Sequence, residues 1–565
     1  MGHPVHNTPR LLDCVNRIIQ NGPKRAEQRI IVFSGMWGVR RLDPLALGGG
    51  TVVLTGDDLF IEEVVRVARR GARVSVSGEA LERVRRARGV VEHVLARGDP
   101  VYGTNTGVGS LSRFRVPFEH LEQFSATLVS RHTTHQGTEV SPEVVRAMMV
   151  TRVNGMAKGG VGVRTELLGA FVDALNAGVH PVVRLGGSVG QADLAEMAEI
   201  GQVLIGRGEA DFRGERMGGA EALRAAGLEP IRLKAKEGLA LISANGITMG
   251  HGSLVLSDVA DLLDVFDITA ALSMEAFGAN LSTVHPEAAR LRPHPGQARA
   301  SDRLRELLAD SYLWRPGAAR NLQDPLSFRC VPQTHGACYD AHAYARGTME
   351  VEINSAGDNP LVLIEDKSII SVGNFDVVAL AVAFDLLRVA LAQVVHLANE
   401  RIQKHLWSQF SGLPTGLAAR DGDEGLRPLG YTSASLAAEA RVLANPVSLD
   451  YRGQIAEGIE DHASMAPLGV RRSQDLLEIA RRMAALELTI SARAVGLRGK
   501  PRLGAGTRAA YDIASLYAAT EPEQHWPDLD GLHEAVTTGR LTARVASEIG
   551  LLEPVSTPGD AVGPE

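Results

Sequence analysis

The stretch Gly187-Ser188-Val189-Gly190-Gln191-Ala192-Asp193-Leu194 is the part of the chain around which the other motifs are arranged. Its single hydroxyl belongs to Ser188, and the next residue is the β-branched Val189. Closing a ring within the backbone needs a hydroxyl that can leave as water and then a glycine, whose backbone nitrogen can reach the preceding carbonyl. A β-branched side chain opposes that closure. The stretch is therefore not expected to cyclise.

Separate motifs lie on both sides of this stretch in a fixed order along the chain. They are Val101-Tyr102-Gly103-Thr104-Asn105-Thr106-Gly107-Val108-Gly109, Asn154, Ala157-Lys158-Gly159, Asn176-Ala177-Gly178-Val179-His180-Pro181, Lys236-Glu237-Gly238-Leu239-Ala240-Leu241, Gln323-Asp324-Pro325-Leu326-Ser327-Phe328-Arg329-Cys330, Asp358-Asn359-Pro360-Leu361, Gly373-Asn374-Phe375 and Glu460-Asp461-His462-Ala463-Ser464-Met465. Any one of them could arise by chance. The ordered set could not.

In this order the motifs resemble those of the histidine and aromatic amino acid ammonia-lyase and aminomutase family, which includes histidase and phenylalanine ammonia-lyase. The resemblance runs from about Thr51 to about Leu551. It implies a mainly α fold with a central bundle of long helices. It also implies a homotetramer whose active sites are built from several subunits.

The same resemblance shows what the central stretch has lost. In the family it reads Gly-Ser-Val-Gly-Ala-Ser-Gly-Asp-Leu, and its Ala-Ser-Gly triad cyclises to 4-methylidene-imidazol-5-one (MIO), an electrophile that captures the substrate amine. Here only Gln191 and Ala192 stand between Gly190 and Asp193. The degenerate loop, residues 190–193, is therefore not expected to form MIO, and no other cofactor is expected.

The composition is typical of a soluble enzyme. The chain has 565 residues, 45% of them hydrophobic, so it can bury a large core. A net charge of -7 gives no reason to expect nucleic acid or membrane binding. Three cysteines, Cys14, Cys330 and Cys338, are too few for a disulfide framework, and no apolar signal segment begins the chain. A cytoplasmic location is expected.

Apolar periodicity predicts three long helices. A helix is expected from Ser473, as N-cap, to Ile490, and a buried bundle helix over 377–402. A third segment, 254–281, carries a charge at every third position, interpreted as a solvated helix face. Those charges are Asp258, Asp261, Asp264 and Asp267. The β-like segments 51–54 and 361–364 are short.

Both ends depart from the family pattern. Residues 1–50 form an N-terminal extension without assigned function, which ends in the linker-like run Gly48-Gly49-Gly50. Residues 51–551 form the catalytic body. Residues 552–565 have the proline, glycine and acidic content of a flexible tail.

Three catalytic residues are retained according to the resemblance: Tyr102, Arg329 and Glu460. The family places its base at Tyr102, in a glycine-rich loop that can swing as a lid. Because a tyrosine near its reference pKa of about 10 is a poor base, helix N-termini or cations must favour the phenolate. Arg329 is the candidate clamp for the substrate carboxylate. The alternatives are a packed loop tyrosine and a structural arginine ion pair.

Two departures accompany the loss of the triad. Ser243 stands where the family carries a catalytic asparagine, and Leu326 replaces a tyrosine. Asn245, two residues further on, is a candidate substitute for the lost asparagine, although its spacing does not match. Asn359 is a candidate substrate-binding residue. The site has thus lost the electrophile and its neighbours while keeping a base and a clamp.

Arg131 and His132 occupy the position that sets side-chain selectivity in the family. An arginine that faces the pocket would favour a second anionic group on the substrate. An arginine that points outward would instead form a salt bridge on the helix surface. His132 and His135 lie one helical turn apart, but a third ligand in register is missing, so no metal is expected.

These residues predict a lyase-family enzyme that acts on an amino-acid-like small molecule by MIO-independent elimination or a related proton transfer. A general base alone contributes two to four orders of magnitude, too little to expel an ordinary amine. A better leaving group or a more acidic proton would be needed. One alternative is a non-catalytic paralogue that binds a ligand or partner subunits. Another is a genuine histidine or aromatic amino acid ammonia-lyase that uses a different electrophile.

Overall fold

The computed structural model describes residues 50–549 apart from 135, 421, 450–452 and 519–525. The proposed extension 1–50, except Gly50 itself, and the proposed tail 552–565 lie outside the described residues, as does His135.

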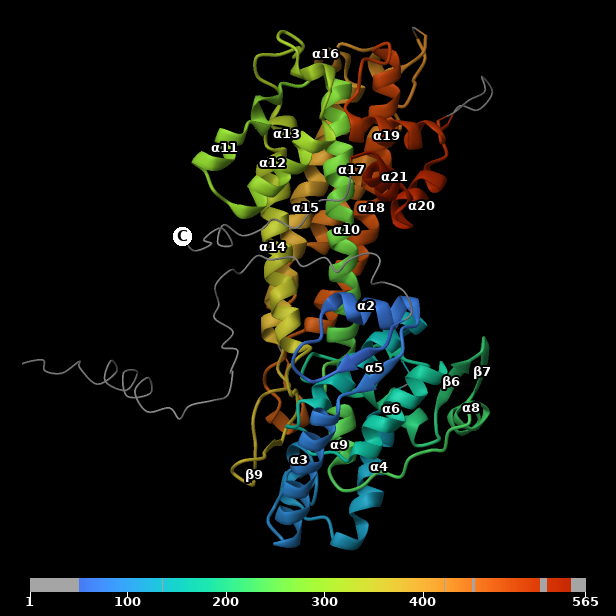
Figure 1. Cartoon of the computed structure of the whole chain (residues 1–565), viewed down its shortest axis with the longest axis vertical. Helices are drawn as coiled ribbons and strands as arrows, with labels where there is room; N and C mark the ends of the chain where they lie inside the picture. The colour runs from blue at the N-terminus through green and yellow to red at the C-terminus, as the bar shows by residue number, and fades with distance from the viewer. Residues whose placement is uncertain (1–49, 135, 421, 450–452, 519–525, 550–565) are drawn as a thin grey trace, which may run out of the picture. The chain divides into compact units, whose positions relative to one another are not determined.

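Five long helices form the centre of the molecule (Figure 1). They are α5 (Pro142–Ala157), α10 (Gly246–Phe277), α14 (Val331–Glu352), α15 (Val378–Leu406) and α18 (Ala466–Leu497). Helix α10 packs against α18, α14 and α5, and α15 packs against α18 and α14. The prediction of a mainly α fold around a bundle of long helices is confirmed.

Shorter helices surround the bundle. They are α2 (Ile61–Arg70), α3 (Gly78–Ala96), α4 (Leu121–His132), α6 (Thr165–Ala177), α7 (Leu194–Leu204), α8 (Gly219–Ala225), α9 (Glu237–Ile242), α11 (Pro286–Leu291), α12 (Pro295–Leu307), α13 (Leu326–Arg329), α16 (Ser408–Ser411), α17 (Leu429–Leu443), α19 (Ala505–Ser515), α20 (Leu529–Thr537) and α21 (Arg540–Ile549).

The strands are short, as expected. The parallel pair β1 (Val52–Leu54) and β2 (Val74–Val76) and the antiparallel pair β8 (Leu361–Leu363) and β9 (Ser368–Ile370) include the two predicted segments. The remaining strands are β3 (Thr138–Glu139) paired with β5 (Arg184–Leu185), and β4 (His180–Pro181), β6 (Glu209–Phe212) and β7 (Glu215–Gly218) in one sheet.

Helix α15 confirms the predicted bundle helix over 377–402. It is long and apolar enough to cross a membrane, with a mean hydropathy of 2.0 in its most apolar window, but 56% of that window is buried in the bundle. Its other face is exposed in the single chain at Val378, Val382, Leu386 and Val389. These positions follow one another at intervals of three or four, so they form one apolar stripe.

Two predictions about helix details are wrong. Helix α18 begins at Ala466, so Ser473 lies inside it, where its hydroxyl donates to the Gly469 carbonyl. The aspartates of α10 do not form a solvated face, because Asp258, Asp264 and Asp267 are buried and only Asp261 is exposed. These aspartates are buried because other helices pack against several sides of α10. The spacing of charges in the sequence does not indicate that packing.

Each of two buried aspartates on α10 has partners from other helices. Arg69 of α2 forms an ion pair with Asp258 through two nitrogens, at 2.5 and 3.0 Å. His335 and Tyr339 of α14 contact the two carboxylate oxygens of Asp267 at 2.7 and 2.8 Å. The charges that looked like a solvated face therefore fasten α10 to its neighbours.

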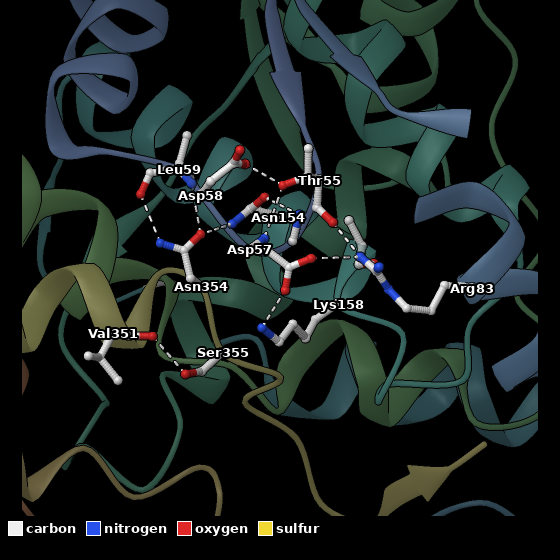
Figure 2. A network of polar contacts seen from close by, with 12 residues as sticks. Thr55, Asp57, Asp58, Leu59, Arg83, Asn154, Lys158, Val351, Asn354 and Ser355 are labelled. Atoms are coloured by element: carbon white, nitrogen blue, oxygen red, sulfur yellow. Dashed lines mark hydrogen bonds and ion pairs between the residues drawn. The ribbon is translucent and has the colours of Figure 1, made fainter. Parts of the chain in front are cut away.

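A network of amide hydrogen bonds joins the first loop of the body to the end of α14 (Figure 2). The fully buried Asn154 accepts from the Gly56 amide at 2.9 Å and donates to the Asn354 side chain at 2.9 Å. Asn354 in turn exchanges two hydrogen bonds with the backbone of Leu59. The network fixes the start of the segment 354–360.

A buried ion pair fixes the other end of that segment. Lys236 and Asp358 are both fully buried and lie 2.7 Å apart. Arg152, also buried, donates to the carbonyl of Gly357 at 3.1 Å. Burial lowers the pKa of Lys236, while the charge of Asp358 opposes that shift. Because both ends of 354–360 are held, the position of Asn359 between them is well defined.

Candidate active site

A cavity of about 760 Å³ opens beside the degenerate loop. It is lined by Tyr102, Val108, Gly109, Ser110, Leu111, His132, Gln191, Ala192, Leu194, Leu239, Ile242, Ser243, Asn359, Ser371, Gly373, Phe375, Asp376, Ile455, Ala456, Ile459, Glu460, Asp461 and His462. These residues come from segments that are far apart in the sequence. They include most of the motifs that the sequence singled out.

The degenerate loop is held by side-chain and backbone hydrogen bonds. The hydroxyl of Ser188 donates to the Asp193 carboxylate at 2.7 Å and accepts from the Gly190 amide at 3.1 Å. Gly190 has φ +84°, and a Cβ there would lie 2.2 Å from the Ser464 hydroxyl oxygen, so only glycine fits. Ser464 donates to the Gly190 carbonyl at 2.9 Å. These hydrogen bonds hold the loop in place.

Four helix starts surround the loop. The amide of Asp193, at the start of α7, donates to Ala244, just before α10. The Ala192 amide donates to Phe375, near the start of α15, and the amide of Met465, which begins α18, donates to Val189. Helix N-termini carry partial positive charge. The floor of the cavity is therefore suited to negative charge that develops during a reaction.

The residues of this loop do not fit an MIO group. Its one hydroxyl, on Ser188, is followed by Val189 and already serves the Asp193 carboxylate. Ala192 adopts φ 60°, a left-handed conformation that glycine takes at lower cost. Gln191 has no hydroxyl to lose. The side-chain nitrogen of Gln191 is buried without a hydrogen-bond partner among the described residues.

Tyr102 and Glu460 meet at the cavity. The Gly109 amide donates to the Tyr102 hydroxyl at 2.8 Å, and Glu460 Oε1 lies 4.0 Å from the place where a Cβ on Gly109 would stand. Burial raises the pKa of Tyr102, the Gly109 hydrogen bond lowers it, and the charge of Glu460 raises it further. The net rise is opposite to the shift that a phenolate base needs at neutral pH.

His132 and Asn359 present one polar group each to the cavity. His132 Nδ1 lies 2.7 Å from the Leu128 carbonyl, so in the neutral ring Nδ1 carries the proton and Nε2 is the acceptor. The side-chain oxygen of Asn359 accepts from the Val372 amide at 3.0 Å, which orients its amide group. Ser243 lines the cavity as well. These residues are brought together as the sequence suggested.

Three predicted residues do not line the cavity of the single chain. Arg131 is exposed on the last turn of α4 and does not line the cavity of the single chain. Asn245 is buried, with its side-chain nitrogen unpartnered among the described residues. Arg329 lies on α13, towards the opposite end of the bundle from α9, and its Nε donates to the Asp324 carbonyl at 2.7 Å (Figure 1).

The charges around the cavity are of one sign. Three carboxylates, Asp376, Glu460 and Asp461, line it, and neither lysine nor arginine does so among the described residues. Two histidines, His132 and His462, also line the cavity. Such a lining disfavours a substrate with a second anionic group, contrary to the expectation drawn from Arg131. It favours a cationic group instead.

Sequence reasoning missed Asp376, His462 and Glu196 as parts of the site. His462 Nε2 and Asp376 Oδ2 form an ion pair of 3.0 Å at the cavity. Glu196, on the first turn of α7, is buried near Asp193 with one carboxylate oxygen unpartnered among the described residues. Asp376 directly follows the Gly-Asn-Phe motif, and this adjacency was the one available signal.

Comparison with known proteins identifies the class to which this site belongs. The model of the family "Aromatic amino acid lyase" matches residues 59–515. Histidine ammonia-lyases from Symbiobacterium thermophilum and Natranaerobius thermophilus are 41% and 35% identical, each alignment covering 88% of this chain and 99% of the relative. The chain therefore belongs to the aromatic amino acid lyase family, whose members act on amino acids.

A solved structure is similar to this chain over nearly the whole fold. The ergothioneine-degrading enzyme ergothionase from Treponema denticola, determined in complex with desmethyl-ergothioneine sulfonic acid, is 30% identical. The TM-score is 0.83, and the match covers 89% of this chain and 100% of that one. Similarity within the family thus extends to enzymes with different named substrates.

The buried acids under the loop generate a pH prediction. Burial, together with the charge of Glu196, raises the pKa of Asp193 to about 7. Burial likewise raises the pKa of Glu196. A carboxyl whose pKa is raised on folding stabilises the protein at low pH, and that contribution is lost as the pH rises through the folded-state pKa. Glu196→Gln removes one charge of the pair, so the benefit should appear mainly above neutral pH.

We therefore expect Glu196→Gln to raise the Tm by about 1–2 °C at about pH 8 and by less at about pH 5.5. Thermal unfolding of the wild type and the variant at both pH values measures this difference. Glu221→Gln, which removes an exposed charge from α8, is the control and should change neither value. An equal Tm gain at the two pH values would show that repulsion between Asp193 and Glu196 is unimportant.

Proposed function

We propose that this member of the family is an MIO-independent lyase that eliminates a neutral amine from an amino-acid betaine. The observation that carries the proposal is the degenerate loop, where the only hydroxyl is engaged with Asp193 and the triad is replaced by Gln191 and Ala192. Without an electrophile in the protein, the substrate itself must carry the leaving group.

A quaternary ammonium group meets that requirement. The N–H of an ordinary α-ammonium group is far more acidic than the Cβ–H, so a base removes the N–H proton first. The resulting neutral amine could leave only as an amide anion. A trimethylammonium group has no N–H. A base therefore takes the Cβ proton, the C=C bond forms, and the Cα–N bond breaks with its electron pair on the departing trimethylamine.

The lining of the cavity supports a cationic substrate. The carboxylates of Asp376, Glu460 and Asp461 attract a permanent positive charge, and Tyr102 and Phe375 offer aromatic faces of the kind that bind quaternary ammonium ions. Ergothioneine, the substrate named for the Treponema denticola relative, is itself a histidine-derived betaine with a trimethylammonium group. The acceptor Nε2 of His132 is placed to contact an imidazole-type side chain.

Tyr102 and Glu460 together supply the base. Both groups line the cavity and can accept the Cβ proton, and the charge of Glu460 adds to the rise that burial causes in the pKa of Tyr102. The amide of Gly109 stabilises the charge when it lies on the Tyr102 oxygen. The helix starts around the loop would stabilise negative charge that develops at Cβ as its proton leaves.

A genuine histidine ammonia-lyase is the second candidate. The names of the relatives at 35–41% identity favour it. It would require an electrophile that residues 190–193 do not supply. A non-catalytic paralogue is a third possibility, which the retention of Tyr102 and Glu460 at one cavity argues against.

Assembly is part of the proposal, together with a cytoplasmic location. The exposed stripe of α15, formed by Val378, Val382, Leu386 and Val389, needs a partner surface, and Arg329 does not line the cavity of its own chain. A homotetramer would cover the stripe and allow Arg329 of one subunit to hold the substrate carboxylate at the cavity of another.

Light scattering of the purified protein is expected to give the mass of a tetramer. Val382→Glu and Leu386→Glu, which place charges on the exposed stripe, should lower that mass, whereas Glu439→Lys on α17 should leave it unchanged. A wild-type protein that stays monomeric at micromolar concentration would remove the composite site and the clamping role of Arg329.

The activity itself is tested by comparing L-histidine with Nα,Nα,Nα-trimethyl-L-histidine and ergothioneine. Trimethylamine release from a betaine is expected, with ammonia release from L-histidine at least about 100-fold slower. Tyr102→Phe should lower kcat by roughly two to four orders of magnitude with little change in binding, because the ring still packs but accepts no proton. Phe171→Leu, a buried change on α6 away from the cavity, serves as the control.

Three outcomes of this assay would contradict the proposal. Efficient ammonia release from L-histidine would favour a genuine ammonia-lyase. Full activity of Tyr102→Phe on a betaine would remove the tyrosine from the base, and binding of betaines without turnover would favour the non-catalytic paralogue.

A further inference from the structure

Asp376 stands beside the loop that replaces the amine-capturing triad. Its backbone forms an antiparallel bridge with Gln191, and the carbonyl of the preceding Phe375 accepts the Ala192 amide at 3.3 Å. Asp376 also lines the cavity. Asp376 therefore lies beside both the degenerate loop and the cavity.

The side chain of Asp376 is fixed in place by two contacts. One carboxylate oxygen accepts from the Val378 amide at 2.9 Å, at the start of α15, and the other pairs with His462 Nε2 at 3.0 Å. The side chain of Asp376 is 26% exposed and that of His462 is 59% exposed, so the histidine is the more accessible to solvent.

We propose that Asp376 determines specificity for a cationic α-nitrogen and that the substrate cation displaces His462 from it. The inference rests on the proposed function for the nature of the substrate. In the free protein the His462 ring contacts Asp376 through Nε2 at 3.0 Å. When a permanent cation enters, it takes the position of the His462 ring beside Asp376. Residues 460–462 then move or rotate away from Asp376.

The surroundings of Asp376 support a cation in that position. Phe375 precedes it and lines the same cavity, and aromatic faces attract quaternary ammonium ions. Glu460 and Asp461 add negative charge from the neighbouring segment. Glu352, at the end of α14, is close enough for the Asp376 charge to contribute to a raised Glu352 pKa. Two carboxylates near one another are stabilised by a cation between them.

The role differs from that of a general base. A trimethylammonium group donates no hydrogen bond, so the attraction is electrostatic and acts on substrate binding and orientation. Asp376→Asn keeps an oxygen for the Val378 amide and keeps the shape, while it removes the charge. His462→Gln removes the ring that contacts the Asp376 carboxylate and leaves Asp376 intact. The two substitutions should therefore shift binding of a cation in opposite directions.

The test measures binding by calorimetry with two probes, Nα,Nα,Nα-trimethyl-L-histidine and 3-(imidazol-4-yl)propanoate, which differ in the α-cation. Both are measured in a Tyr102→Phe background so that turnover does not interfere. The parent is expected to bind the betaine roughly tenfold or more tightly than the uncharged analogue. Asp376→Asn should abolish that preference, and His462→Gln should increase it several-fold. Glu457→Gln, an equal loss of charge outside the cavity lining, should leave it unchanged.

Three results would overturn the inference: no preference for the betaine in the parent, a full preference in Asp376→Asn, or an equal loss of affinity for both probes in that variant. The last would mean that Asp376 only supports the structure. Failure of the proposed function is a separate result, because ammonia release from L-histidine would disprove betaine elimination without changing a binding preference that depends on Asp376.

Discussion

The hydrogen bond from Ser188 to the buried carboxylate of Asp193 is the interaction on which the site depends. Asp193 also accepts from the backbone amide of Thr248 at 2.9 Å, so one side chain joins the degenerate loop to the starts of α7 and α10. The arrangement costs free energy, because the carboxylate is fully buried and its pKa is raised. In return the loop is ordered by hydrogen bonds instead of by a covalent ring.

The protein and the substrate therefore supply different groups for the reaction. The protein retains a proton acceptor at Tyr102 and Glu460, helix starts that favour developing negative charge, and a cavity lined with carboxylates. Under the proposed function, residues 190–193 supply no electron sink, so the elimination uses a leaving group that the substrate already carries. The carboxylates at the cavity support a quaternary ammonium in that role.

The sequence predicted the family and the bundle, because ordered motifs record contacts that the fold must make. It failed where position depends on several packed elements at once. Asp258 and Asp267 looked solvated but are buried against α2 and α14. Arg131 is exposed although its neighbour His132 lines the cavity, since a change of one residue on a helix turns a side chain by about 100°. Asp376 carried no signal beyond its motif.

The covalent state of the degenerate loop is the most direct test of this account. Trypsin should release residues 185–207, which contain the whole loop, and mass spectrometry of that peptide and of the intact chain measures its state. We predict the mass of the unmodified sequence. A deficit of two water molecules in this peptide would show that an electrophile forms after all, and would contradict the claim that the substrate must supply its own leaving group.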